Sequence, residues 1–438
     1  MHDEALELFR ALLRIDTTNP PGNEREAAQL LADFLAKDGL SPKLIDSGPL
    51  RTNVVTRLKG TGARPPLLLT AHLDVVAAEP SRWKHPPFGA VIDDGWLYGR
   101  GTVDMKNMAA MSAMVMRVLK REGAVLQRDL IFAAVADEEA GCALGSQYLV
   151  DHHADEVRAE YALGEIGGFT LRLAGRRLYP IQVAQKGMVW MKASVEGTPG
   201  HGSMPRDDNP VVGLAAALAK LVPDALPVHI TPALTAFLRG VVSTQPKLAQ
   251  VMLPLLLRPE LVDRLLGLMP DQSTARAMSA IMRNTATPTV LRAGTKTNVI
   301  PSTAEAEIDG RTVPGQSVDD FLREVQALLG PKVKLDVLRS LEPVSVSSDT
   351  PMFATLCDAL RTMDPEGIPV PYLIPGFTDA AAFSKLGTTY YGFAPIRFPD
   401  TPKVAFSELF HGDNERIPVE GFKVGLDALL LAVRTWCC

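Results

Sequence analysis

Apolar residues in the first 180 positions alternate between helical and strand-like spacing. The segments at 4–14, 24–37 and 105–121 carry apolar residues at the three- and four-residue intervals of an amphipathic helix. The segments at 67–70 and 130–136 are short and uniformly apolar, which is typical of strands buried on both faces. This part of the chain therefore predicts an α/β domain with a parallel or mixed sheet covered by helices.

After residue 181 the pattern changes, and the segments follow the order of a small two-layer module. Strand, helix, hairpin, helix and strand in this order form the βαββαβ, or ferredoxin-like, arrangement. The segments are a half-exposed strand at 189–195, a helix from Pro210 to residue 221, a strand at 304–308, a helix capped by Ser317 that runs to residue 329, and a last strand at 333–338.

The chain thus divides into a larger domain in two pieces and a smaller module inserted between them. We place the larger domain at 1–180 and 344–438, and the module at 181–343. Within the module, 231–290 is an additional stretch, rich in Leu and Met, for which we predict helices. At roughly 100 to 200 residues per domain, a chain of this length has two or three domains.

Composition narrows the class of protein further. The chain has 438 residues, of which 46% are apolar and 22% charged, and this balance excludes a disordered chain. The net charge is -5, and no basic stripe that could follow a phosphate backbone is present, so nucleic acid is not an expected partner. Small molecules are the partners that this composition favours.

The cysteines and the N-terminal segment bear on location. Cys142, Cys357, Cys437 and Cys438 include no C-x-x-C pair, so they predict neither a disulfide framework nor a thiolate zinc site. The chain starts with acidic residues, unlike a signal peptide, and no apolar run approaches the 18 or so residues of a membrane span. We therefore expect a cytoplasmic protein with no membrane partner.

Side chains that bind metals cluster at the ends of the predicted strands. His72 and Asp74 follow the first apolar strand, Asp104 precedes the long helix, and Glu138 and Glu139 follow the next apolar strand. In open α/β sheets, ligands and catalytic groups gather at the carboxyl ends of the strands. Separate motifs at these positions can therefore converge on one site.

The residue types suit a particular chemistry. An imidazole with several carboxylates is a ligand set for Zn2+ or Mn2+, and one aspartate can hold two ions roughly 3.5 to 4 Å apart. In the pair Glu138–Glu139, one carboxylate can bind metal while its neighbour takes a proton from water. An isolated pair of glutamates is usually a solvated loop, but the preceding apolar strand and the company of His72 and Asp104 favour function here.

At this point the sequence resembles a known family, over nearly the whole chain. It is similar to the di-zinc amidohydrolases and metallopeptidases that include aminoacylase, carboxypeptidase G, acetylornithine deacetylase and succinyl-diaminopimelate desuccinylase. The motifs that carry the resemblance are AHLDVV (71–76), W-x-x-x-P-F (83–88), LYGRGTVDMKN (97–107), DEEAG (137–141), GEIGG (164–168), GTPGHGSMP (197–205), TNVIPS (297–302), DGRTVPG (309–315) and HG (411–412).

The resemblance implies a dinuclear zinc centre, for which Co2+ or Mn2+ can substitute. His72 and Glu165 would be terminal ligands of one ion and Glu139 and His411 of the other, with Asp104 bridging both. The implied general base is Glu138, and Asp74 would orient the imidazole of His72. A cis peptide bond after Asp104 is also expected from the family.

For the inserted module, the resemblance implies a lid through which two chains form a homodimer. His201 would reach the partner's active site and donate to the tetrahedral oxyanion, although without the family match it would be an ordinary loop histidine. Arg311 and Asn298 would bind the carboxylate of a small-molecule substrate. Gly376 lies in a loop that corresponds to one lining the substrate site, where Pro375 and Phe377 depart from the common small-residue pattern.

The function we predict is metal-dependent hydrolysis of the amide bond in N-acyl amino acids or at the C-terminal residue of short peptides. Family members with deacylase or carboxypeptidase activity tend to carry Glu at the position of Glu165, whereas aminopeptidases and dipeptidases tend to carry Asp. The alternatives are a dipeptidase or aminopeptidase of the same family, or a non-catalytic relative. Such relatives usually lose a ligand or the base, and here all are present.

Overall fold

The computed structural model describes residues 1–173, 175–242, 250, 253–269, 272–400 and 406–438. The chain forms two compact units. Unit 1 comprises Met1–Val183, Val346–Pro371 and Thr378–Cys438, and unit 2 comprises Ala184–Ser345 and Tyr372–Phe377. The strands β9 (Arg176–Gln185) and β17 (Ile368–Ile374) each begin in unit 1 and end in unit 2.

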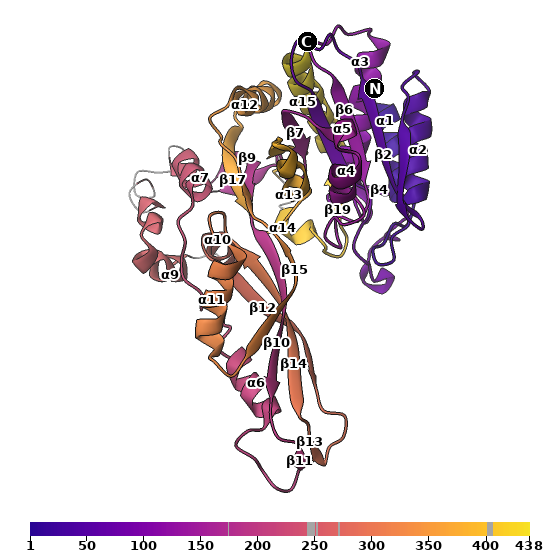
Figure 1. The fold of residues 1–438 in the computed structure, drawn as a ribbon. Coiled ribbons are helices and arrows are strands. Elements are labelled where there is room, and N and C mark those ends of the chain that lie inside the picture. Colours follow the sequence, from indigo (N-terminus) through magenta and orange to yellow (C-terminus); the bar gives the residue numbers. More distant parts are fainter. Residues whose placement is uncertain (174, 243–249, 251–252, 270–271, 401–405) are drawn as a thin grey trace. The chain divides into compact units, whose positions relative to one another are not determined.

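Unit 1 is built on a mixed sheet, which confirms the predicted fold class (Figure 1). The strand β3 runs parallel to β6 on one side and to β7 on the other, whereas β2 pairs with β6 antiparallel. All residues of β3 and β6 are buried, as their apolar sequences require. The strands along the sheet are β1 (Lys43–Gly48), β2 (Arg51–Leu58), β6 (Leu130–Val135), β3 (Leu67–His72), β7 (Tyr161–Gly164), β18 (Thr389–Gly392), β9 and β16 (Val344–Ser345), with β8 (Leu171–Leu173) and β17 also paired to β9.

Helices cover this sheet, and the longest central one is buried over most of its length. The helix α3 (Lys106–Arg121) packs on β3 and β6 and also contacts α1 and α15, which buries every residue from Lys106 to Leu119. The other helices of unit 1 are α1 (His2–Leu13), α2 (Glu24–Ala36), α4 (Ser146–His152), α5 (Ala154–Val157), α12 (Pro351–Met363), α13 (Ala380–Phe383), α14 (Phe406–Leu409) and α15 (Val419–Cys437), with 3-10 turns η1 (Pro80–Arg82) and η3 (Ser384–Leu386).

A second, three-stranded sheet completes unit 1. It consists of β4 (Val91–Asp93), β5 (Trp96–Tyr98) and β19 (Arg416–Pro418), with β5 in the middle. Its strands join two segments that are more than 300 residues apart in the chain. The loop between β5 and α3 therefore lies beside the segment that precedes β19.

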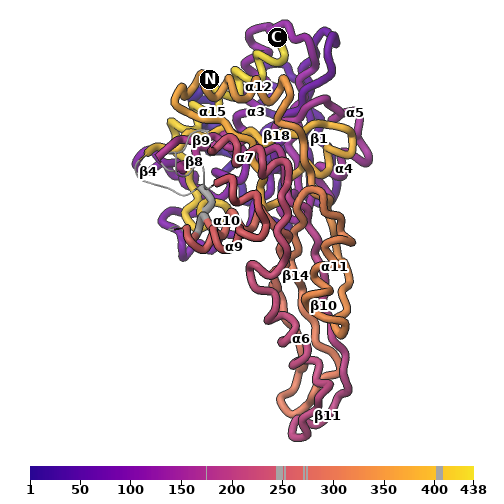
Figure 2. Tube along the Cα trace, turned by 90° about the vertical axis from the view of Figure 1, so that its left-hand side faces the viewer, coloured from indigo at the N-terminus to yellow at the C-terminus, as the bar shows by residue number. Residues whose placement is uncertain are grey.

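Unit 2 has the predicted βαββαβ order. Its sheet runs β12 (Thr285–Ala293), β14 (Thr303–Thr312), β10 (Gly187–Glu196) and β15 (Lys334–Leu341). Buried residues alternate along β14, and they form an apolar core with α6 (Pro210–Leu218) and α11 (Val318–Leu329). Figures 1 and 2 both show these two helices lying along the sheet. Ser317 begins α11 with a capping box, since its hydroxyl accepts from the amide of Asp320 and the Asp320 carboxylate accepts from the amide of Ser317.

The additional stretch in unit 2 is helical, but it ends earlier than the sequence suggested. Its elements are α7 (Pro232–Val242), η2 (Leu253–Leu257), α9 (Pro259–Gly267) and α10 (Gln272–Met282). The predicted end at residue 290 is wrong, because Thr285–Val290 form the first part of β12, where β-branched residues alternate along the strand. Within the predicted stretch, 243–249, 251–252 and 270–271 lie outside the described residues.

Two further observations concern the helices and the cysteines. Among the described residues, no helix combines the length and the apolar character that crossing a bilayer requires. All four cysteines have free thiols, and three of them are buried.

Candidate metal centre

Three neighbouring strands bring the predicted ligands to one edge of the unit 1 sheet. His72 is the last residue of β3, Glu138 and Glu139 follow β6, and Glu165 follows β7. Because β6, β3 and β7 are adjacent and parallel, their carboxyl ends meet. Asp104 reaches the same place from the loop before α3.

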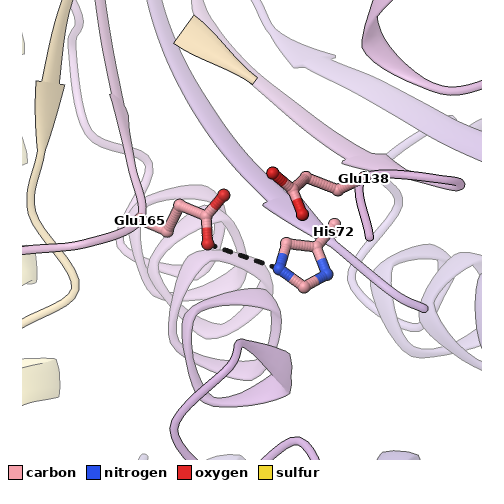
Figure 3. A group of neighbouring side chains, drawn as sticks. All are labelled: His72, Glu138 and Glu165. Atoms are coloured by element: carbon pink, nitrogen blue, oxygen red, sulfur yellow. Dashed lines mark ion pairs between the residues drawn. The ribbon is translucent and has the colours of Figure 1, made fainter. Parts of the chain in front are cut away.

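The side chains at this edge approach within coordination range of one another. The Nε2 atom of His72 lies 2.8 Å from Oδ1 of Asp104 and 3.3 Å from Oε2 of Glu165. Figure 3 shows Glu165 and Glu138 on neighbouring sides of the same imidazole. Two groups, His72–Glu138–Glu165 and His72–Asp104–Glu139, each have ligand atoms within 4.8 Å of one another.

His411 joins the cluster from the far end of the chain. Its Nε2 atom lies 3.3 Å from Oδ2 of Asp104 and 3.2 Å from Oε2 of Glu139. The two carboxylate oxygens of Asp104 therefore face different histidines, Oδ1 towards His72 and Oδ2 towards His411. This is the geometry that a bridging carboxylate needs.

Two carboxylate oxygens in the cluster are buried and lack a hydrogen-bond donor. Among the described residues, nothing donates to Oε1 of Glu139 or to Oε1 of Glu165. A buried anionic oxygen without a partner is costly, and a cation removes that cost. With two imidazoles and several carboxylates, this donor set fits divalent ions such as Zn2+ or Mn2+.

The pKa values of the cluster reflect the same excess of negative charge. Burial, together with the charge of Glu165, raises the pKa of Glu138 well above its ordinary range. Burial likewise raises the pKa of Glu165 to about 8. Hydrogen bonds with Asp104 and Glu139 raise the pKa of His411 to about 10. The cluster thus holds more carboxylates than the chain balances with its own cations.

Asp74 supports the cluster in two ways. Its backbone oxygen lies 3.0 Å from Nδ1 of His72, while its carboxylate oxygen Oδ1 is 3.6 Å from the same nitrogen. The carboxylate accepts the backbone N–H groups of Glu138 and Glu139, both at 3.1 Å. Asp74 therefore fixes the imidazole and also the backbone that carries the two glutamates.

A buried polar network that sequence reasoning missed lies behind Asp74. Asn19 donates to Asp74 at 2.8 Å and to Asp137 at 3.1 Å, and Arg51 pairs with Asp137 at 2.9 Å and with Glu24 at 2.7 Å. Asp137 directly precedes the glutamate pair and has a positive φ of 65°. The strand that begins at Arg51, with the sequence RTNVVTRL, is largely polar and offered no local signal for these partners.

Two further residues near the cluster were also missed. Asp379 is buried and accepts from the hydroxyl of Ser146 at 2.5 Å, and burial raises its pKa to about 6. Tyr390 donates to the backbone oxygen of Glu165 at 3.2 Å. The Asp104–Met105 bond is cis, as expected, and so is Glu165–Ile166, which was not expected.

The predicted substrate residues of unit 2 fall into two separate places. His201 and Asn298 lie together, because β11 (Gly200–His201) pairs with β13 (Val299–Ile300) and the amide of Gly202 donates to the backbone oxygen of Asn298. Arg311 is at the opposite end of β14, eight residues from Thr303, or about 26 Å of strand. One chain therefore cannot bring Arg311 to the same ligand group as His201 and Asn298.

Arg311 is held within unit 2. Its Nε and Nη2 atoms donate to the two carboxylate oxygens of Asp309, at 2.9 and 3.1 Å, and its guanidinium lies 5.2 Å from the ring centre of Phe377. Among the described residues, nothing accepts a hydrogen bond from its Nη1 atom. Gly376, in the neighbouring loop, has no atom within 4 Å of the position that a Cβ would take.

A mixed α/β sheet with carboxylates and histidines converging at its edge, and an inserted βαββαβ module, define a metal-dependent hydrolase of the metallopeptidase class. Residues 68–435 match the profile described as Peptidase family M20/M25/M40. The match covers most of the chain, which belongs to this family.

Named relatives agree with this assignment. The chain is 30% identical to the N-fatty-acyl-amino acid synthase/hydrolase PM20D1 of Xenopus tropicalis, over 96% of this chain and 83% of the relative. It is 26% identical to aminoacylase-1 of Mus musculus, over 97% and 93%. Its fold is similar to that of the M20 family metallo-carboxypeptidase Sso-CP2 from Sulfolobus solfataricus, with a TM-score of 0.74, 18% identity and 99% of each chain covered.

Proposed function

We propose that this protein hydrolyses the amide bond of N-acyl amino acids, or of the C-terminal residue of short peptides, at a dinuclear zinc centre. The observation that carries the proposal is the convergence of two histidines and four carboxylates at one sheet edge, with Asp104 between the histidines. Two buried carboxylate oxygens without donors among the described residues add to the argument. Co2+ or Mn2+ suits the same donor set.

The residues would divide the ions between them. His72 and Glu165 would hold one ion, Glu139 and His411 the other, and Asp104 both. When bound, such ions polarise an amide carbonyl and lower the pKa of water. The cluster contains four carboxylates and only two imidazoles, so bound cations would balance its remaining negative charge.

Glu138 is the proposed general base. It lies in the cluster beside His72 and Glu165, where its carboxylate could take a proton from the attacking water and pass it to the departing amine. Its backbone amide donates to the carboxylate of Asp74, which keeps the base close to His72. Asp74 thus acts as a positioning residue for both.

The residues of unit 2 are proposed to act across a homodimer. Nδ1 of His201 lies 3.2 Å from the amide of Ser203, which donates to it, and 2.7 Å from the Ser203 hydroxyl. These contacts suit a neutral imidazole with its proton on Nε2, where it could donate to an oxyanion. The distance along β14 between the His201 end and Arg311 supports contribution from two chains. The free edge of the Arg311 guanidinium suits a substrate carboxylate, and Gly376 leaves room beside it.

The names of two relatives support the proposed substrate class. One is named an N-fatty-acyl-amino acid synthase/hydrolase and the other an aminoacylase, which favours deacylase activity over dipeptidase activity. Residues 1–180 and 344–438 would form the catalytic domain and 181–343 the lid. A cytoplasmic location remains our prediction, and the four free thiols agree with it.

A hydrolysis screen tests the proposal. The protein is assayed with N-acetyl, N-succinyl, long-acyl and N-aroyl amino acids and with unblocked dipeptides, each with added Zn2+, Mn2+ or Co2+ and after chelation. We expect chelator-sensitive release of amino acid from at least one N-acyl class. Preference for unblocked dipeptides would favour the dipeptidase alternative, and turnover indifferent to chelation would contradict the metal mechanism.

A further inference from the structure

Glu415 is a fully buried carboxylate that takes no part in the proposed chemistry. It lies four residues after His411 and just before β19. Its Oε1 atom accepts the backbone N–H groups of Val103 at 2.6 Å and Asp104 at 3.2 Å, and its Oε2 atom accepts that of Gly101 at 3.1 Å. Three amides of the loop that carries Asp104 therefore converge on one side chain.

Arg100 pairs with this carboxylate and reaches the chain at His411 itself. Its Nη1 atom donates to Oε2 of Glu415 at 2.7 Å, and its Nη2 atom donates to the backbone oxygens of Ala77 and His411, each at 3.3 Å. The guanidinium also lies 5.3 Å from the ring centre of Trp83. Arg100 is 2% exposed and Glu415 is 0% exposed.

Burying an ion pair is costly unless further hydrogen bonds satisfy its remaining atoms. Here the extra bonds come from backbone groups on both sides, the loop at 101–104 and the residue His411. Gly101 permits this loop shape, since its φ is +91° and a Cβ would meet Val75 at 3.0 Å. The pair therefore joins two segments that are about 300 residues apart in the chain.

The link matters because His411 is not held by a sheet or a helix. Its side chain is 54% exposed, its φ is 54°, and it lies on a turn rather than in a strand or helix. His72, by contrast, is fully buried within β3. The position of the His411 imidazole relative to Asp104 depends on what holds the two backbones together.

We propose that Glu415 and Arg100 are positioning residues that hold His411 beside Asp104 and so set the affinity of one of the two metal positions. The proposal rests on the proposed function for the identity of the ligands. The pair contacts no substrate, and it acts through the backbone of Gly101–Asp104 and the carbonyl of His411. Its loss should weaken one ion selectively and leave the ion beside His72 and Glu165 in place.

The test uses Glu415→Gln and Arg100→Lys, with two comparison variants. His411→Ala identifies which binding event belongs to His411. Asp364→Asn removes another buried carboxylate of unit 1, which pairs with Arg177 and Tyr179. Among the described residues it makes no hydrogen bond or ion pair with the cluster, so it controls for general loss of stability. Metal-free proteins are titrated with Co2+ and followed by visible absorption.

We expect the event lost in His411→Ala to weaken about 10- to 100-fold in Glu415→Gln and Arg100→Lys, the range seen when outer partners of metal ligands are removed. The other event should change by less than about threefold, and Asp364→Asn should leave both unchanged. Equal weakening of both events, or no weakening, would overturn the proposal.

Hydrogen exchange of the metal-free proteins gives an independent readout. By mass spectrometry, peptides covering 99–105 should exchange at least about tenfold faster in Glu415→Gln than in the wild type. The Gln side chain has one acceptor oxygen instead of two and no negative charge, so it cannot accept all three amides of this loop. No such change is expected in Asp364→Asn. Unchanged exchange would refute the link. If the wild type takes up no Co2+, the metal centre itself is wrong, and the exchange result still decides whether Glu415 holds this loop.

Discussion

The two histidines of the cluster are held in opposite ways. His72 ends a fully buried central strand, and hydrogen bonds with Asp74 and Asp104 fix both ring nitrogens. His411 is half-exposed on a turn, and its carbonyl is held by Arg100. The sheet alone places the first ligand, whereas the second depends on contacts between distant segments.

This difference indicates which ligand substitutions should affect folding and which should affect metal binding alone. A ligand within a sheet shares the stability of the core, so its loss affects folding as well as binding. A ligand on a turn can be lost with little effect on folding. The following predictions are ordered from the largest expected effect to the smallest.

Glu138 is held by neither histidine, and its replacement tests whether the two proposed metal positions form one reaction centre. Glu138→Gln should lower kcat for the best N-acyl substrate by about 10²- to 10⁴-fold, because the general base is lost. Metal content should stay the same. Glu122→Gln, at an exposed glutamate far from the cluster, is the control. Steady-state kinetics with metal analysis checks this, and retained turnover would remove Glu138 from the mechanism.

Replacing each histidine in turn tests the comparison directly. In the metal-free protein, His72→Ala should reduce the free energy of unfolding by about 2 to 3 kcal/mol, because it empties a buried position and leaves carboxylates unpaired. His411→Ala should change it by about 1 kcal/mol or less, because its ion pairs with Asp104 and Glu139 involve a half-exposed imidazole and are screened by solvent. Urea unfolding of the two variants measures this. Equal destabilisation by the two substitutions would mean that the two histidines contribute alike to folding.

The polar network behind Asp74 should support the ligands that the sheet holds, on the side of His72. Asn19→Ala removes donors to Asp74 and Asp137, so we expect kcat to fall about tenfold as the glutamate backbone shifts. Asn284→Ala, at a buried asparagine of unit 2 that accepts from Val313 and donates to Glu324, is a matched control. It should lower Tm similarly and change kcat by less than about twofold. Equal losses of kcat in both variants would assign Asn19 a purely structural role.

The smallest expected effect is on the pH dependence of stability, at Asp364, which lies outside the metal cluster. Burial raises the pKa of Asp364, but hydrogen bonds from Arg177 and Tyr179 outweigh it, and the net pKa is lowered. Its stabilising contribution is therefore complete above about pH 5 and is lost as the pH falls below about 4, where the unfolded chain takes up the proton first. The stability difference between wild type and Asp364→Asn should shrink by about 1 kcal/mol over this range, as urea unfolding at each pH would measure. A difference independent of pH would contradict this.

The sequence predicted the ligands at the strand ends better than the residues that position them. The apolar segments at 67–70 and 130–136 predicted adjacent buried strands, and ligand residues at their ends had to meet. His411 was placed only by resemblance, because no local pattern links a turn at residue 411 to a loop at 104. Asn19, Arg51, Glu415 and Asp379 were missed for the same reason, since their partners lie far away in the chain.

In unit 2 the strand-like patterns at 189–195 and 304–308 predicted the sheet, and Ser317 as an N-cap predicted a helix start. The strand at Thr285 was hidden at the end of a Leu- and Met-rich helical stretch. Its alternating threonines were the signal, and neighbouring helical composition obscured it.

The most direct test of the account is the position of bound metal. Crystals of the zinc-loaded protein, measured at the zinc absorption edge, should give two anomalous peaks. One should lie beside His72 and Glu165 and the other beside Glu139 and His411, with the carboxylate of Asp104 between them. A single peak, or peaks away from these side chains, would contradict the dinuclear centre.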